Sequence, residues 1–153
     1  MDTGQLFHEN CIILNLEAKD KESAMQALYK TLYQAGKVKE SFLKGVMDRE
    51  KVFPTGLKIG DFGIAIPHTD PEHVKEAGIA IATLKNPVEF ECMDNPDTKI
   101  EAGIIFMLAL ENGHNHVEVI SQIVKMFQNQ AVLEALQKAE TNQEVMGIVK
   151  SSL

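Results

Sequence analysis

A histidine directly after a short apolar strand is the residue of this chain best placed to do chemistry. His68 follows residues 64–66 (Ile-Ala-Ile), which are typical of a buried strand, and Pro67, which has no N–H for a sheet ladder. Ligands gather at such strand ends in open α/β sheets, and imidazole exchanges protons near neutral pH. The pattern predicts a functional histidine; the alternative is a loop histidine that only forms hydrogen bonds.

A second candidate is an arginine on the helix predicted over residues 40–52. With Phe42 at 0° and about 100° per residue, Val46 falls at about 40°, Phe53 at about 20° and Arg49 at about −20°. This phase places Arg49 within an apolar stripe. A guanidinium held there can bind an anion through two parallel hydrogen bonds. The alternatives are an arginine that reaches out to solvent or one that forms a structural ion pair.

A third candidate is His116, in the first turn of the helix predicted over residues 115–128. With His116 at 0°, Ile120 falls at about 40° and Ile123 at about −20°, so the histidine shares the core-facing stripe. If the preceding strand is parallel to the strand over 64–66, His116 and His68 meet at one sheet edge, beside a helix N-terminus. Such a cluster suits a dianionic group such as phosphate. The alternative is a core histidine.

The elements that must position these residues alternate between strands and helices. We predict strands over 11–16, 57–59, 64–66, 78–84, 88–90 and 102–110, and helices over 20–35, 40–52, 115–128, 131–139 and 144–151. Asp20 is the expected N-cap of the first helix, and Gly36 is expected to end it. This alternation predicts a single α/β domain over residues 1–153. Its fold is a three-layer sandwich with a mixed, mainly parallel central sheet flanked by helices on both faces.

Composition excludes several classes of protein. The 153 residues carry a formal net charge of −7, which argues against nucleic acid or anionic membrane as the main partner. The longest apolar stretch, 102–110, is too short to span a bilayer, and no secretion signal is evident. Cys11 and Cys92 lack the spacing of a disulfide framework or a zinc site. We expect a cytoplasmic protein without direct membrane insertion.

Three segments of the chain resemble the enzyme IIA domain of the fructose/mannitol type (type 2) of the bacterial sugar phosphotransferase system. They are residues 63–69 (Gly-Ile-Ala-Ile-Pro-His-Thr), residues 48–51 (Asp-Arg-Glu-Lys), and His116 with the following Val-Glu-Val-Ile-Ser-Gln-Ile. The resemblance extends over nearly the whole chain, in order. Thr69 and residues 90–93 and 106–110 are most similar to the galactitol branch.

The resemblance implies a role for each candidate. His68 matches the histidine that accepts a phosphoryl group from phosphorylated HPr and passes it to a cysteine of a IIB component. His116 matches a second histidine that binds the phosphoryl group or steadies the His68 ring, and Arg49 matches an arginine that stabilises phosphate. The membrane component IIC is linked only indirectly, and no metal or organic cofactor is implied. Thr69 stands where many members carry glycine, which could change the loop beside His68.

Acceptance of phosphate requires that the imidazole of His68 be neutral. Asp70 and Glu72 lie close in sequence and could raise its pKa, but we expect both to face solvent. The site should also be shallow and accessible, because two partner proteins must reach it. An apolar rim would suit them, and Phe62 is a candidate for it.

Two other functions remain open. A regulatory IIA-like protein of the nitrogen-related phosphotransferase system would share the fold and the site. A metalloenzyme would use imidazole and carboxylate ligands drawn from His68, Asp70, His73, His114 and His116. Against a metal site, His114 and His116 are two residues apart at a helix start, and no H-E-x-x-H motif is present.

Overall fold

A five-stranded mixed sheet forms the centre of the computed structural model, which describes residues 3–111 and 115–153. The strand order is β1-β4-β5-β3-β2. The strands are β1 (Phe7–Leu16), β2 (Gly56–Ile59), β3 (Phe62–Ala65), β4 (Gly78–Glu91) and β5 (Lys99–Ala109).

The predicted mixed sheet is confirmed, but it is evenly mixed rather than mainly parallel. β1 with β4 and β3 with β5 are parallel pairs, whereas β4 with β5 and β2 with β3 are antiparallel. The reason lies in the connections. Strands joined by a short turn pair as hairpins, and only two residues separate β2 from β3.

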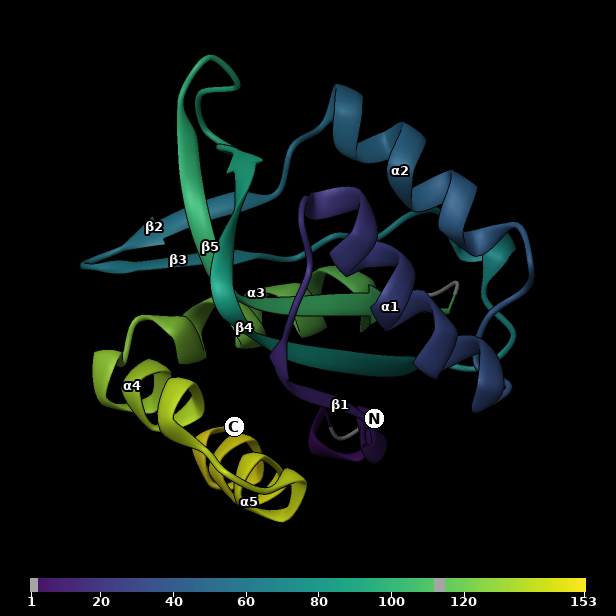
Figure 1. Ribbon diagram of the computed structural model, residues 1–153. Coiled ribbons are helices and arrows are strands. Elements are labelled where there is room, and N and C mark those ends of the chain that lie inside the picture. Colours follow the sequence, from purple (N-terminus) through teal and green to yellow (C-terminus); the bar gives the residue numbers. More distant parts are fainter. Residues whose placement is uncertain (1–2, 112–114) are drawn as a thin grey trace.

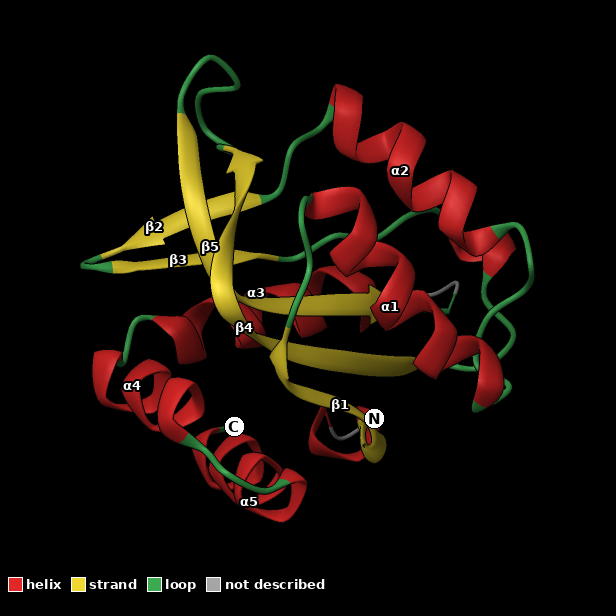
Figure 2. Cartoon of the chain, viewed as in Figure 1, coloured by secondary structure: helices red, strands yellow, loops and turns green. Residues whose placement is uncertain are grey.

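Helices cover both faces of the sheet, as predicted (Figures 1 and 2). α1 (Lys21–Gln34) and α2 (Phe42–Val52) pack on one face, and α3 (Asn115–Phe127), α4 (Gln130–Lys138) and α5 (Asn142–Ser152) on the other. Two short 3₁₀ helices, η1 (Thr3–Leu6) and η2 (Pro71–His73), complete the described elements. The helix over 20–35 begins and ends as expected: Asp20 accepts a hydrogen bond from the Ser23 N–H at 2.8 Å, and Gly36 follows with φ 75°.

Two hydrophobic cores result, one on each face of the central strand β5. Ile104, Phe106 and Leu108 belong to the core beneath α3, α4 and α5. Ile105 and Met107 belong to the core beneath α1 and α2. Successive side chains of a strand point to opposite faces, so a strand covered on both sides must be apolar throughout. The central strand predicted over 102–110 is therefore confirmed, with bounds of Lys99–Ala109.

The strands predicted over 78–84 and 88–90 are wrong in one respect, because they form one continuous strand, β4. The sequence Asn86-Pro87 had suggested an end. Instead, the register with β5 is irregular between Thr83 and Val88, so Pro87 lies in a stretch without regular pairing. Proline is tolerated at such irregularities because its missing N–H is not needed there. The resulting long β4–β5 hairpin extends past α1 in Figure 1.

No helix within residues 3–111 and 115–153 is long and apolar enough to cross a membrane.

Candidate functional site

His68 lies where β3 leaves the sheet beside the carboxyl end of β5. The parallel pairing aligns Ile64 with Ile104 and continues as an isolated bridge between His68 and Leu108. The Leu108 N–H donates to the Pro67 carbonyl at 3.0 Å. At the start of β3, Gly63 lets the strand lie close to β5, since a Cβ there would lie 2.0 Å from the carbonyl oxygen of Glu101. The strand-end position predicted for His68 is therefore what the structure shows.

The ring of His68 is held in one tautomer. Its Nδ1 lies 2.7 Å from the carbonyl oxygen of Ile66. A carbonyl can only accept, so Nδ1 carries the proton and donates it to this bond. In the neutral ring the lone pair then belongs to Nε2. The side chain is partly buried, and the lone pair gives Nε2 the character of a nucleophile.

The structure brings His116 to His68. The two ring centroids are 6.2 Å apart, and the ring planes meet at 68° in an edge-to-face arrangement. His116 lies in the first turn of α3, which follows β5, so the parallel pairing of β3 and β5 is what joins the two histidines. His114 lies outside the described residues.

Arg49 sits at the edge of the apolar face of α2 rather than in its middle. The buried residues of that face are Phe42, Val46 and Glu50, whereas the side chain of Arg49 is 36% exposed. Phe53 is 60% exposed, because α2 ends at Val52 and the helical phase no longer applies beyond it. The prediction that Arg49 and Phe53 share one apolar stripe of the helix was therefore wrong.

The guanidinium of Arg49 nevertheless lies at the site. Its Cζ is 5.1 Å from the centre of the Phe53 ring, and its Nη1 is 3.9 Å from Oδ1 of Asp70, two residues after His68. Its Nε is buried and has no hydrogen-bond partner among the described residues. Arg49 is also the only arginine of the chain. A positively charged group with an unused donor suits an anion, since buried donors are ordinarily paired.

Electrostatics keep His68 neutral. Burial lowers the pKa of His68 below its ordinary 6.5, and the charges of Arg49 and His116 lower it further. The hydrogen bond to Ile66 and the charge of Asp70 act in the opposite direction but do not prevail. Asp70 and Glu72 have side chains that are 67% and 74% exposed, as expected.

We expect an NMR titration of the His68 imidazole to give a midpoint below 6.5. A lowered pKa means that the ring is already neutral at pH 7, so the lone pair on Nε2 stays available until the pH falls below 6.5. The ring signals can be assigned by their loss in His68→Ala. A midpoint above 6.5 would contradict the electrostatic account.

Thr69 and His73 connect the loop after His68 to α2. Thr69 is buried, and a Cβ at Gly45 of α2 would lie 3.0 Å from both Thr69 Oγ1 and His73 Cδ2. Nδ1 of His73 lies 2.8 Å from Oγ of Ser41. A pocket of about 330 Å³ opens between α2 and this loop, with Arg49 and Phe53 in its lining.

Phe62, which we expected to form an apolar rim at the site, is not among the exposed apolar residues beside it. Phe62 starts β3, six residues before His68, and is packed against a core. Val52 and Phe53 at the end of α2, 66% and 60% exposed, lie beside Arg49 instead. Val117, directly after His116, is 76% exposed.

Sequence reasoning missed Glu50. Its side chain is 3% exposed and accepts hydrogen bonds from Thr55. The signal was present, because Glu50 continues the row of Phe42 and Val46 at steps of four residues. Within residues 3–111 and 115–153, no group of three or more His, Cys, Asp or Glu side chains could hold a metal ion.

Comparison with known families gives a decisive match. The family model for the phosphoenolpyruvate-dependent sugar phosphotransferase system, EIIA 2, matches residues 5–152. The chain belongs to this EIIA type 2 family.

Two relatives illustrate the range of EIIA type 2 proteins. The ascorbate-specific EIIA component of Salmonella paratyphi A is 32% identical over 145 residues, covering 94% of this chain and 92% of the relative. The 2-O-α-mannosyl-D-glycerate-specific EIIABC component of Escherichia coli is 31% identical over 95% of this chain. This chain spans only 22% of the length of that EIIABC protein.

Two solved structures share the EIIA fold. One is the complex of the mannitol enzyme IIA with phosphorylated enzyme IIB from Escherichia coli, with a TM-score of 0.78 and 26% identity, covering 95% of this chain and 99% of that one. The other is the nitrogen regulatory protein IIA-Ntr from Neisseria meningitidis, with a TM-score of 0.75 and 26% identity, covering 95% and 97%.

Proposed function

We propose that this EIIA domain is a phosphoryl carrier that accepts phosphate from phosphorylated HPr on His68 and donates it to a cysteine of a IIB component. The observation that carries the proposal is the convergence of His68, His116 and Arg49 at one edge of the sheet. Two imidazoles and a guanidinium suit a dianionic group. The system to which the family belongs transfers phosphate from phosphoenolpyruvate to sugars, and a carrier role within it needs such a site.

The transfer needs placement and charge stabilisation more than covalent assistance from the protein. Nε2 of His68 forms a bond to phosphorus while the N–P bond of the donor breaks, and the electron pair of that bond returns to the donor's nitrogen. The phosphorylated ring keeps its proton on Nδ1 and gains positive charge, which the Ile66 carbonyl stabilises. In this scheme Arg49 binds the oxygens of the phosphoryl group, and His116 donates a hydrogen bond to it or steadies the ring.

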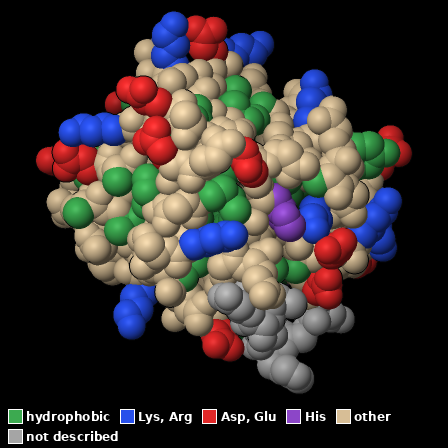
Figure 3. Space-filling model, turned by 90° about the horizontal axis from the view of Figure 1, so that it is seen from below, with side chains coloured by type: hydrophobic (Ala, Val, Ile, Leu, Met, Phe, Trp, Pro, Cys, Tyr) green, Lys and Arg blue, Asp and Glu red, His purple; other side chains and the backbone are tan. Residues whose placement is uncertain are grey.

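The partners in this proposal are proteins, and the surface around the site suits a protein face. Val52 and Phe53 expose apolar area beside Arg49, and Val117 does so directly after His116. The exposed carboxyl groups of Asp48, Asp70 and Glu72 lie on the helix and the loop that carry this part of the site. Asp48 and Asp70 are paired with Lys44 and Arg49, so a partner with an apolar patch and a rim of mixed charge would complement this surface. On the face shown in Figure 3, acidic and basic side chains are interspersed, with apolar side chains between them. Dispersed charge of this kind favours a protein partner over nucleic acid.

The pathway and the location complete the proposal. Thr69 and residues 90–93 and 106–110 support galactitol uptake, although the relatives described above are named for other substrates. We place the domain in the cytoplasm, where HPr and IIB meet it, with the membrane component IIC reached only through IIB.

A reconstituted assay tests the proposal. The chain is mixed with enzyme I, HPr and ³²P-labelled phosphoenolpyruvate, and then with a panel of IIB proteins that includes the galactitol type. We expect the label to appear on the chain only when HPr is present, and to move fastest to the cognate IIB. Failure of the chain to take label from phosphorylated HPr would refute the carrier role.

A regulatory role is the alternative that a specific observation supports, namely the likeness to the nitrogen regulatory protein of Neisseria meningitidis. In that case the chain would accept phosphate from an HPr-type donor but pass it to no IIB in the panel. Metal analysis of the purified protein tests the remaining alternative, a metalloenzyme.

A further inference from the structure

A buried network of hydrogen bonds links α2 to the strand end that carries His68. Oε2 of Glu50 accepts the backbone N–H of Thr55 at 2.8 Å, and Oε1 accepts the Thr55 hydroxyl at 2.8 Å. The same hydroxyl oxygen accepts the backbone N–H of Ile66 at 3.2 Å. Glu50 and Thr55 are 3% and 2% exposed, so these groups form their bonds away from solvent.

Ile66 connects this network to the proposed nucleophile. β3 ends at Ala65, so the N–H of Ile66 is held by a side chain rather than by the sheet ladder. The carbonyl of the same residue accepts the Nδ1–H of His68. One residue therefore carries both the network and the contact that fixes the tautomer of the ring.

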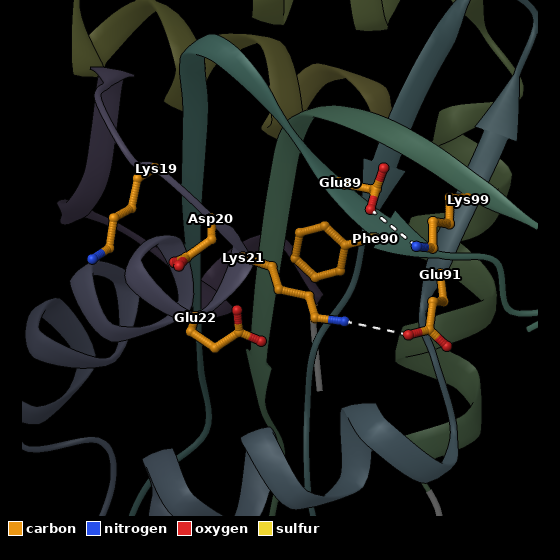
Figure 4. A pocket seen from close by; sticks show the side chains of 8 residues that line it. All are labelled: Lys19, Asp20, Lys21, Glu22, Glu89, Phe90, Glu91 and Lys99. Carbon is orange, nitrogen blue, oxygen red and sulfur yellow. Dashed lines mark ion pairs between the residues drawn. The ribbon is translucent and has the colours of Figure 1, made fainter.

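One basic and one acidic side chain act on the buried carboxyl group of Glu50. Burial raises the pKa of Glu50 to about 7, while the two hydrogen bonds from Thr55 and the charge of Lys21 lower it and Glu91 raises it. Lys21 on α1 and Glu91 on β4 lie 3.7 Å apart and line a pocket of about 410 Å³ (Figure 4). Glu50 is thus a buried carboxyl group whose described hydrogen bonds both come from Thr55.

We propose that Glu50, acting through Thr55, is a positioning residue that fixes the Ile66 carbonyl and thereby the His68 ring for phosphoryl transfer. This inference rests on the proposed carrier function. The network holds the proton on Nδ1 and the lone pair on Nε2, and it holds the ring in place when phosphorylation makes it positive. Small displacements of a reacting group slow a reaction strongly, so a loosened Ile66 should lower the rate rather than the affinity for the donor.

Thr55→Val and Thr55→Ser form a matched pair that tests this role. Valine keeps the shape of threonine but removes the hydroxyl that joins Glu50 to Ile66, whereas serine keeps the hydroxyl. We expect Thr55→Val to lower kcat for phosphate acceptance from phosphorylated HPr by about 10- to 100-fold, with KM unchanged. Thr55→Ser should restore kcat to within about threefold of the parent. The Nδ1–H signal of His68 in NMR spectra should weaken or vanish in the valine variant and persist in the serine variant.

The outcomes separate this inference from the carrier function. If the parent takes phosphate and Thr55→Val keeps its kcat and its Nδ1–H signal while losing only thermal stability, the network is purely structural and the inference is overturned. If the parent takes no phosphate, the carrier function fails. The Nδ1–H signal of His68 then decides whether the network positions the ring. Loss of that signal in Thr55→Val alone supports positioning, and its persistence in both variants overturns it.

Discussion

Replacing His68 with alanine should abolish labelling of the chain by phosphoenolpyruvate, enzyme I and HPr. The variant lacks Nε2 of His68, a nitrogen for which the described residues provide a neutral ring, a fixed tautomer and a nearby cation. The variant should still fold, because the substitution removes one side-chain hydrogen bond, worth about 1 kcal/mol. Incorporated ³²P, measured after separation from HPr, gives the result directly.

His8→Ala provides the matched control. His8 is the second residue of β1 and lies three strands away from His68. Its neighbour Phe7 is at the same level of the sheet as His68, because Phe7 pairs with Ile79, Ile79 with Leu108, and Leu108 with His68. The His8→Ala variant should take up as much ³²P label as the parent. Label that persists in His68→Ala would move the acceptor to another residue, and His116 would be the first to examine.

Exchanging Arg49 for lysine should slow phosphate acceptance by about 10- to 100-fold, which is less than the loss expected from removing a preorganised donor outright. Lysine keeps the charge but lacks the planar fork, including the Nε that has no partner within the described structure. Stability should change by less than about 1 kcal/mol, because the side chain is partly exposed and its contact with Phe53 is a weak cation–π interaction. Rapid-quench kinetics and thermal unfolding measure the two effects separately.

The reverse exchange at an exposed site of the same helix is the control. Lys51→Arg should leave both the rate and the stability unchanged, since Lys51 is exposed. A variant Arg49→Lys that unfolds early but transfers phosphate at the parent rate would make Arg49 a structural residue.

Most of the fold was predictable because local signals and burial agree. Asp20 and Gly36 bound α1 as expected, and the apolar run that contains Ile104 to Ala109 is the central strand. Pro87 misled because its effect depends on pairing: it ends a strand within a regular ladder but is accepted where the register is irregular. The balance of parallel and antiparallel pairs follows from connections, which periodicity does not report.

The site was predictable in part, for a similar reason. The strand end at His68 and the phase of His116 required only local patterns, and their meeting required one assumption about parallel strands. Arg49 was placed by a helical phase that Phe53 does not follow, because the helix has ended there. Glu50 was missed because a carboxyl group in a core row is unexpected until its partner, Thr55, is known to face it.

Having a single arginine gives the protein a built-in spectroscopic reporter. Isotope labelling with arginine alone would produce one side-chain Nε–H resonance, that of Arg49, with no Nε–H signal from any other residue to overlap it. Since that nitrogen has no partner among the described residues, its chemical shift should respond directly to the arrival of a phosphoryl group. The phosphorylation state of the domain could then be followed in real time, even in assemblies too large for conventional assignment.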